Sequence, residues 1–136
     1  NATTTSSTTT TTTPNLPDLY VSNKVAGKTN TINVDARNNT FVNYTINNFG
    51  SLKSNYTNVK SFVYNTTSGQ NVSVYNQTDN LPELAVGESA TFSIYSDNNL
   101  GTANWFIEID VDFNGNNTEL NKVNNNATWT FSTPLP

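Results

Sequence analysis

The sequence predicts an all-β domain, built as a sandwich of two sheets and about seven strands, with an extended Thr-rich strand before it. From Asp18 onward, short alternating runs of apolar and polar residues are separated by Asn, Gly and Ser, a pattern typical of sandwiches and barrels. No segment keeps a 3.6-residue apolar period over ten residues, so we expect no true helix. The 136 residues suit one domain, and the 34% hydrophobic share suits one modest core.

Eight segments carry the strand pattern, near residues 18–23, 30–36, 40–48, 58–64, 70–75, 89–95, 104–112 and 127–132. The segment 104–112 is the clearest, because every second residue is apolar and therefore points to one face of the strand. The same alternation places Val72 and Val74 inward and Asn71 and Ser73 outward. The residues expected to form the core are Leu19, Val21, Val42, Tyr44, Ile46, Val59, Phe92, Ile94, Trp105, Ile107, Ile109, Val111, Trp129 and Phe131.

The composition argues against several classes of function. The chain has no Cys, His or Met, so it offers no disulfide, no thiol and no nucleophile–histidine pair. Its net charge is −4 and it has only six Lys and Arg residues, too few for a nucleic-acid-binding surface. No Gly-rich phosphate loop occurs, and Glu108 and Asp110 share an outward strand face, where such carboxylates are normally solvated. We therefore expect neither an enzyme nor a bound cofactor.

Asn-x-Ser/Thr sequons, the acceptors of N-glycosylation, recur along nearly the whole chain. They begin at Asn1, Asn38, Asn43, Asn55, Asn65, Asn71, Asn76, Asn116 and Asn126. In a chain this rich in Asn and Thr, several arise by chance. Their even spread, and their positions in turns or on outward strand faces as at Asn43, favour a dense covering of N-glycans instead.

The sequons place the chain outside the cell. The chain begins at Asn1 without an initiator Met, which we interpret as the removal of a secretory signal peptide. No apolar run approaches the roughly 18 residues that span a membrane. We therefore expect an extracellular, cell-surface protein with no membrane span in this chain.

Residues 110–115 have the Asp-x-Asp-x-Asn-Gly spacing that begins a calcium loop. The bidentate Glu that such a loop needs at its twelfth position is Asn121 here, and Glu119 falls two residues short. A strand end followed by an Asn-Gly hairpin turn is the favoured interpretation. Calcium held by Asp112, Asn114 and Glu119 is the alternative. Sugar binding is a further alternative, but the Tyr and Trp residues form no predicted platform.

Four stretches resemble the CARDB family, the Ig-like, cell-adhesion-related domains of bacterial and archaeal surface proteins. They are residues 17–21 (PDLYV), 42–50 (VNYTINNFG), 84–89 (LAVGES) and 112–126, the last with Glu119 ahead of three consecutive Asn. The resemblance covers residues 17–132. It implies a seven-stranded Ig-like sandwich used for adhesion or as a structural spacer, without catalytic residues. Lys122 or Val123 stands where the family often has a second acidic residue, which argues against an inherited ion site.

Residues 1–13 form a low-complexity tract of Thr and Ser ahead of a Pro-containing connector, residues 14–17, and the sandwich, residues 18–136. Thr favours extended backbone, and thirteen residues at roughly 3.3 Å each span about 40 Å, the length of a sandwich. The connector disfavours pairing of the tract with its own domain. We predict that the tract completes a sheet of the next subunit, so that identical subunits form a head-to-tail filament. The donor residues are Ala2, Thr3, Thr4, Thr5, Ser6, Ser7, Thr8, Thr9, Thr10, Thr11, Thr12 and Thr13.

This architecture is similar to that of archaeal surface threads, thin filaments of glycosylated Ig-like subunits joined by donor strands. The likeness rests on the Thr/Ser-rich N-terminus, the connector and the sequon-dense β domain. The alternative is a module of a surface-anchored adhesin, in which residues 1–13 form a stalk. Other cells or surfaces are expected as contacts of the filament.

Overall fold

The structure, a computed structural model, describes residues 14–22, 32–34, 40–95 and 101–134. Its strands are β1 (Leu19–Ser22), β2 (Asn33–Val34), β3 (Thr40–Asn48), β4 (Thr57–Asn65), β5 (Val72–Leu81), β6 (Ser89–Tyr95), β7 (Ala103–Val111) and β8 (Asn126–Thr133). A three-residue 3₁₀ turn, η1 (Val123–Asn125), is the one helical element in these ranges. The predicted all-β class is therefore confirmed. Within the same ranges, no helix has the length and apolar character needed to cross a membrane.

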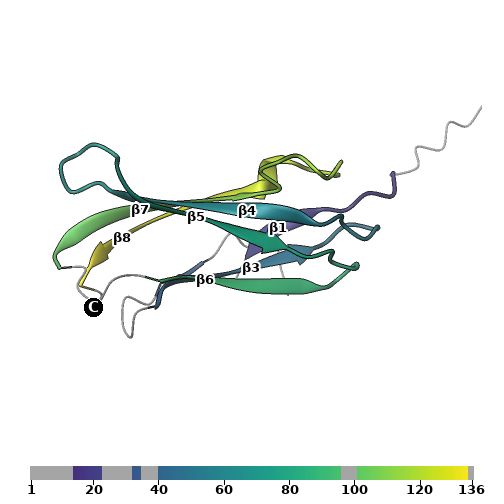
Figure 1. Cartoon of the computed structure of the whole chain (residues 1–136), viewed down its shortest axis with the longest axis horizontal. Helices are drawn as coiled ribbons and strands as arrows, with labels where there is room; N and C mark the ends of the chain where they lie inside the picture. The colour runs from purple at the N-terminus through teal and green to yellow at the C-terminus, as the bar shows by residue number, and fades with distance from the viewer. Residues whose placement is uncertain (1–13, 23–31, 35–39, 96–100, 135–136) are drawn as a thin grey trace, which may run out of the picture.

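The strands form two antiparallel sheets that pack face to face (Figure 1). In the first sheet β3 pairs with β6 on one side, and with both β1 and β2 on the other. The second sheet has the order β5-β4-β7-β8. Two four-stranded antiparallel layers are the architecture of an Ig-like sandwich, as predicted.

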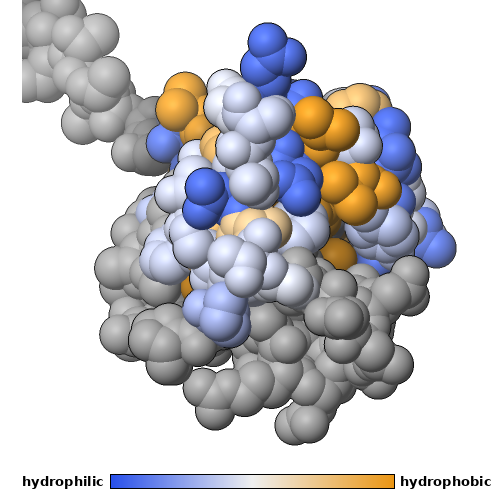
Figure 2. Space-filling model, turned by 90° about the vertical axis from the view of Figure 1, so that its left-hand side faces the viewer, coloured by the Kyte–Doolittle hydropathy of each residue, from blue (hydrophilic) through white to orange (hydrophobic). Residues whose placement is uncertain are grey.

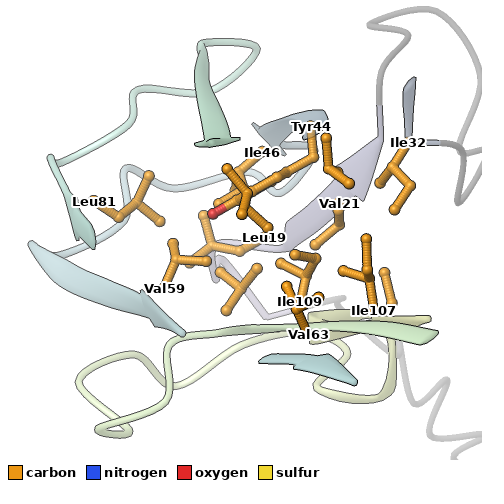
Figure 3. Close-up of a cluster of buried hydrophobic side chains, with 14 of the residues drawn as sticks. Leu19, Val21, Ile32, Tyr44, Ile46, Val59, Val63, Leu81, Ile107 and Ile109 are labelled. Carbon is orange, nitrogen blue, oxygen red and sulfur yellow. The ribbon is translucent and has the colours of Figure 1, made fainter. Parts of the chain in front are cut away.

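The core fills the space between the two sheets, and Figure 3 shows side chains of both layers pointing toward one another. Most of the predicted core residues are buried, while Phe92, Trp129 and Phe131 are only partly buried. Ile32, Val63, Leu81 and Leu84 also join the core. Each fully buried Leu, Ile or Val contributes about 1.5–3 kcal/mol relative to the exposed side chain. This burial is what holds the sheets together.

One polar contact crosses the core. The Tyr44 hydroxyl of β3 lies 3.2 Å from the Ser61 hydroxyl of β4. Burial raises the pKa of Tyr44, so the phenol stays neutral and keeps its hydrogen bond. The contact fixes the two central strands of the sandwich against each other.

The prediction for β5 was wrong in two respects. The strand extends to Leu81 instead of ending at residue 75, because its backbone pairs with β4 along nearly its whole length despite the polar run at residues 77–80. Val72 and Val74 were expected inward, yet they are 53% and 56% exposed. A register shift at Val63 interrupts the pairing beside them.

The β4–β5 hairpin reaches past the end of the first sheet (Figure 1). Beyond the register shift, the alternation of residues along β5 no longer follows the inward and outward faces of β4, and Tyr75, paired with the inward Val63, takes the inward side. Viewed from this end, the molecule shows apolar surface between hydrophilic side chains (Figure 2).

Candidate functional site

The chain enters the sandwich at Asp18, and the side chain of Asn48 at the end of β3 fastens this point. Asn48 is fully buried. Its Oδ1 accepts hydrogen bonds from the backbone N–H groups of Asp18 (3.1 Å) and Gly50 (3.0 Å). Its Nδ2 donates to the carbonyl oxygens of Leu52 (2.8 Å) and Leu84 (2.9 Å). One amide side chain thus joins three of the four stretches that resemble the family.

Gly50 lies against the connector. A Cβ atom at this position would stand 2.3 Å from the carbonyl oxygen of Leu16 and 2.5 Å from the amide nitrogen of Asp18. Both are backbone atoms, so no side-chain movement would relieve the overlap. The backbone of the adjacent Ser51 also donates to the Leu16 carbonyl at 3.0 Å. The glycine is therefore required by the close approach of two chain segments.

The fourth stretch, residues 112–126, also binds the point where the chain enters the sandwich. Glu119 Oε1 accepts a hydrogen bond from the backbone N–H of Leu19 at 2.8 Å, and its Oε2 accepts one from Asn125. The backbone N–H of Leu120 donates to the Pro17 carbonyl at 3.0 Å. Burial raises the pKa of the Glu119 carboxyl, against the opposing effect of these two hydrogen bonds. We call Asn48, Gly50 and Glu119, with their partners at residues 16–19, the N-terminal clamp.

Asp112, one of the three calcium candidates, organises the loop after β7. It is buried, has a left-handed φ of 56°, and accepts hydrogen bonds from the backbone N–H groups of Asn116 (2.9 Å) and Asn117 (3.1 Å). The Thr57 hydroxyl lies 2.5 Å from its Oδ1 and 2.6 Å from Asn114 Oδ1. Lys122 Nζ lies 4.0 Å from Asp112 Oδ2.

The carboxylate of Asp112 therefore faces N–H donors of Asn116 and Asn117, while the single hydrogen of the Thr57 hydroxyl can serve either Asp112 Oδ1 or Asn114 Oδ1. The third candidate, Glu119, belongs to the N-terminal clamp. Within the described ranges, no three or more His, Cys, Asp or Glu side chains are grouped so that they could hold a metal ion.

The expected Asn-Gly hairpin is corrected by the structure. The N–H of Gly115 closes a turn onto the Asp112 carbonyl at 2.9 Å, but residues 116–125 separate this turn from β8. A turn at this place was predicted correctly, but its central residues are Phe113 and Asn114 instead of Asn-Gly, and the direct return of the strand was wrong. The intervening residues are used to bind Asp112 and to build the clamp, which a two-residue hairpin would not allow.

The sequons within the described residues lie at the surface. Asn55, Asn71, Asn76, Asn116 and Asn126 are exposed, and Asn43 and Asn65 are half-buried. Asn43 accepts a hydrogen bond from the Ser93 hydroxyl at 2.6 Å on the outer face of the first sheet. The side chain of Asn55 contacts the backbone of Asn116, because Asn55 Nδ2 donates to the Asn116 carbonyl at 3.1 Å. Asn1, Asn38 and the donor residues 2–13 lie outside the described residues.

Strand β8 is an outer strand of the second sheet, and its inward side is incompletely covered. Trp129 and Phe131 face the core beside Ile107 and Trp105 of β7. The two β7 side chains are buried, whereas Trp129 and Phe131 are half-buried. The core is therefore more open along β8 than along its neighbour. The Thr133 hydroxyl at the end of this strand accepts a hydrogen bond from Trp105 Nε1 at 2.9 Å.

Comparisons with known proteins agree with this geometry. The CARDB family model matches residues 16–129, a range that contains all four stretches and the N-terminal clamp. A similar solved structure is the CARDB domain of the PF1109 protein from Pyrococcus furiosus, in complex with di-metal ions. It is 22% identical, covers 95% of this chain and 98% of its own, and superposes with a TM-score of 0.50. No curated protein matches the chain by sequence.

Proposed function

Because the chain belongs to the CARDB family, a family of non-catalytic Ig-like domains of surface and adhesion proteins, we propose that it is the structural subunit of an extracellular filament. Residues 1–13 of each subunit act as a donor strand for the next, and N-glycans cover the outward strand faces. The observation that carries the proposal is that Trp129 and Phe131, on the inward side of the outer strand β8, are only half-buried.

The donor tract fits such an opening chemically. An added strand pairs through its backbone and lays alternate side chains on the exposed core. Eight residues of β8 extend about 26 Å, which the tract of thirteen residues exceeds. Thr methyl groups and Ala2 would cover the rings of Trp129 and Phe131 without needing deep pockets. The contact joins two different surfaces, so it repeats without closing and yields a filament.

The N-terminal clamp supports the same proposal mechanically. In a donor-strand filament, the pull between subunits passes through residues 14–18 into the body of the domain. These are the residues that Asn48, Gly50 and Glu119 hold from two sides. A tract that bears tension must be firmly attached to its domain, and these contacts provide that attachment.

A chain that lacks residues 2–13 tests the proposal. We expect this chain to fold and to remain monomeric by light scattering, while the full chain forms filaments visible by electron microscopy. A synthetic peptide of residues 1–13 should bind the truncated chain and raise its melting temperature. The same peptide with Pro at alternate positions should not, because Pro lacks the backbone N–H group. Filaments from the truncated chain would overturn the proposal.

The acceptor surface has its own matched pair of variants. Phe131→Thr removes an inward ring of β8 and should weaken binding of the peptide. Thr130→Ser changes the neighbouring outward side chain and should leave binding unchanged. Equal binding by both variants would locate the acceptor elsewhere on the domain.

A module of a surface-anchored adhesin is the second candidate, since family membership favours it equally. There residues 1–13 would form a stalk, and the clamp would fasten the stalk. This candidate predicts a monomer in solution whose tract is cut readily by proteases. The filament predicts a tract protected until the polymer is broken.

A further inference from the structure

The outer face of the second sheet carries a strip of aromatic rings, on the side away from the core. Phe62 and Tyr64 of β4 stack with their ring centroids 6.5 Å apart, and Tyr64 lies 5.9 Å from Phe106 of β7. Phe113, just after β7, lies 6.5 Å from Phe62. Lys60 Nζ completes the strip, 4.5 Å from the Phe113 centroid. We call these residues the outer aromatic strip.

The strip remains accessible to solvent. Phe62, Tyr64 and Phe106 are half-buried, mainly against each other, and Phe113 is 53% exposed. In Figure 1 the second sheet forms the upper layer, and the first sheet packs against its opposite face. Single exposed rings are ordinary on protein surfaces, but contiguous apolar patches mark contact sites. We therefore expect another chemical group to bind over the outer aromatic strip.

The register of the sheet places glycosylation acceptors at both sides of the strip. Asn76 of β5 is paired directly with Phe62 of β4 and is exposed on the same face. Directly paired residues have Cβ atoms about 4.5–5.5 Å apart, so a sugar on Asn76 begins beside the Phe62 ring. On the far side, Asn126 of β8 is paired with Asp110 and is also exposed. The strip thus lies between two acceptor asparagines.

We propose that the outer aromatic strip is a stacking platform for the protein's own N-glycan, with the first sugar rings on Asn76 lying on Phe62. The axial C–H groups of a pyranose form an apolar face, and an aromatic ring provides a flat partner for it. Covalent attachment removes the cost of bringing the two together, since the tether keeps the local concentration of sugar high.

A glycan fits this face better than a protein partner does. A flat protein interface would have to accommodate bulky hydrophilic groups on both Asn76 and Asn126. The polar row through Glu108 and Asp110, whose carboxylates accept from Asn126 Nδ2, suits sugar hydroxyl groups more than an apolar interface. A glycan on Asn126 would replace one of these two N–H groups and leave one carboxylate to a sugar hydroxyl. This inference rests on the glycosylation included in the proposed function, and it does not depend on the donor strand.

A double-mutant cycle on the purified glycoprotein tests the stacking. Asn76→Gln should lower the melting temperature by roughly 2–4 °C when Phe62 is present, as expected for loss of one stacked contact. In the Phe62→Ala background the same change should cost less than about 1 °C. Asn71→Gln is the matched control, because Asn71 precedes β5 outside the paired register and should have no coupling to Phe62.

Two direct measurements accompany the cycle. Peptide mapping by mass spectrometry should find a glycan on Asn76, and nuclear Overhauser contacts should join its first sugars to the Phe62 ring protons. Equal losses in both Phe62 backgrounds, or absent contacts on an occupied Asn76, would overturn the stacking while leaving the filament intact. An Asn76 that carries no glycan would also overturn the proposal, because no sugar would then be attached beside Phe62. Loss of filaments with the stacking intact would count against the donor strand alone.

Discussion

Replacing Asn48 by Leu should be the most damaging single polar-to-apolar change in the domain. Leu has the branched shape of Asn but bulkier ends, so the variant removes the hydrogen bonds and also overpacks the site, a cost that the same substitution at the neighbouring Asn47 shares. The side chain of Asn48 is fully buried and makes four of them, with the backbone of Asp18, Gly50, Leu52 and Leu84. Its neighbour Asn47 is buried to 1% exposure, yet its Oδ1 and Nδ2 have no hydrogen-bond partner within the described structure.

The expected loss follows from the groups that would remain. The N–H groups of Asp18 and Gly50 would lose the Asn48 acceptor in a buried setting, at about 1–3 kcal/mol each. The Leu84 carbonyl would suffer less, since it also accepts from the Ser54 N–H at 2.9 Å. We therefore expect a loss of roughly 3–5 kcal/mol for Asn48→Leu. Asn47→Leu should be neutral or slightly stabilising, because it removes a buried amide whose hydrogen bonds are unmade.

Urea unfolding followed by Trp fluorescence would measure both variants against the parent chain. The urea concentration at the midpoint of unfolding should fall sharply for Asn48→Leu, while the slope of the unfolding free energy against urea stays unchanged. For Asn47→Leu the midpoint concentration should stay the same or rise. Equal destabilisation by the two substitutions would refute the reasoning. It would mean that the loss comes from placing Leu in this part of β3, and not from the hydrogen bonds of the clamp.

Three further predictions concern the clamp and the hairpin. Gly50→Ala should destabilise by roughly 3 kcal/mol in the same urea assay, because its Cβ would overlap the backbone of residues 16–18, and Ser51→Ala is the control. Glu119 has a raised pKa when folded, so its contribution to stability is full below the unfolded pKa and is lost as pH rises through the folded pKa. Melting temperatures from pH 4 to 7.5 should therefore decline less in Glu119→Gln than in the parent, and identical profiles would contradict this. Val72→Thr with Val74→Thr should change the melting temperature by less than about 2 °C and reduce binding of a hydrophobic dye, whereas a large loss would mean that the hairpin is packed.

The alternation of residues predicted the existence of each strand that the structure describes, because each sheet has one buried face and period two is then imposed on the sequence. It failed at the start of β5, where Val72 and Val74 are exposed beside a register shift and Tyr75 pairs with the inward Val63. Alternation assumes an uninterrupted ladder of paired residues, and it contains no information on where an extra residue shifts the register. The extension of β5 through residues 77–80 was missed for a related reason, since backbone pairing with β4 needs no apolar residue.

The candidate sites were readable from the sequence to different degrees. The Asn-x-Gly at residues 48–50 signalled a turn, but the contacts of Asn48 with Asp18 and Leu84 span 30 and 36 residues and depend on the tertiary fold. The outer aromatic strip was partly readable, because Phe62 alternates with buried neighbours on β4. Its closeness to Asn76 depends on the register of β4 with β5, which sequence alone does not fix.

The residues of the N-terminal clamp belong to the family pattern, and their role is structural. Asn48, Gly50 and Glu119 lie in the stretches that resemble the family, and their polar groups are engaged in fastening the chain entry. Residues committed to such contacts offer little to a partner. Binding must then depend on surfaces outside the clamp, and two such surfaces with incompletely covered aromatic rings are the inward side of β8 and the outer aromatic strip. They lie on opposite faces of the second sheet, so one face can take a neighbouring subunit while the other carries glycan.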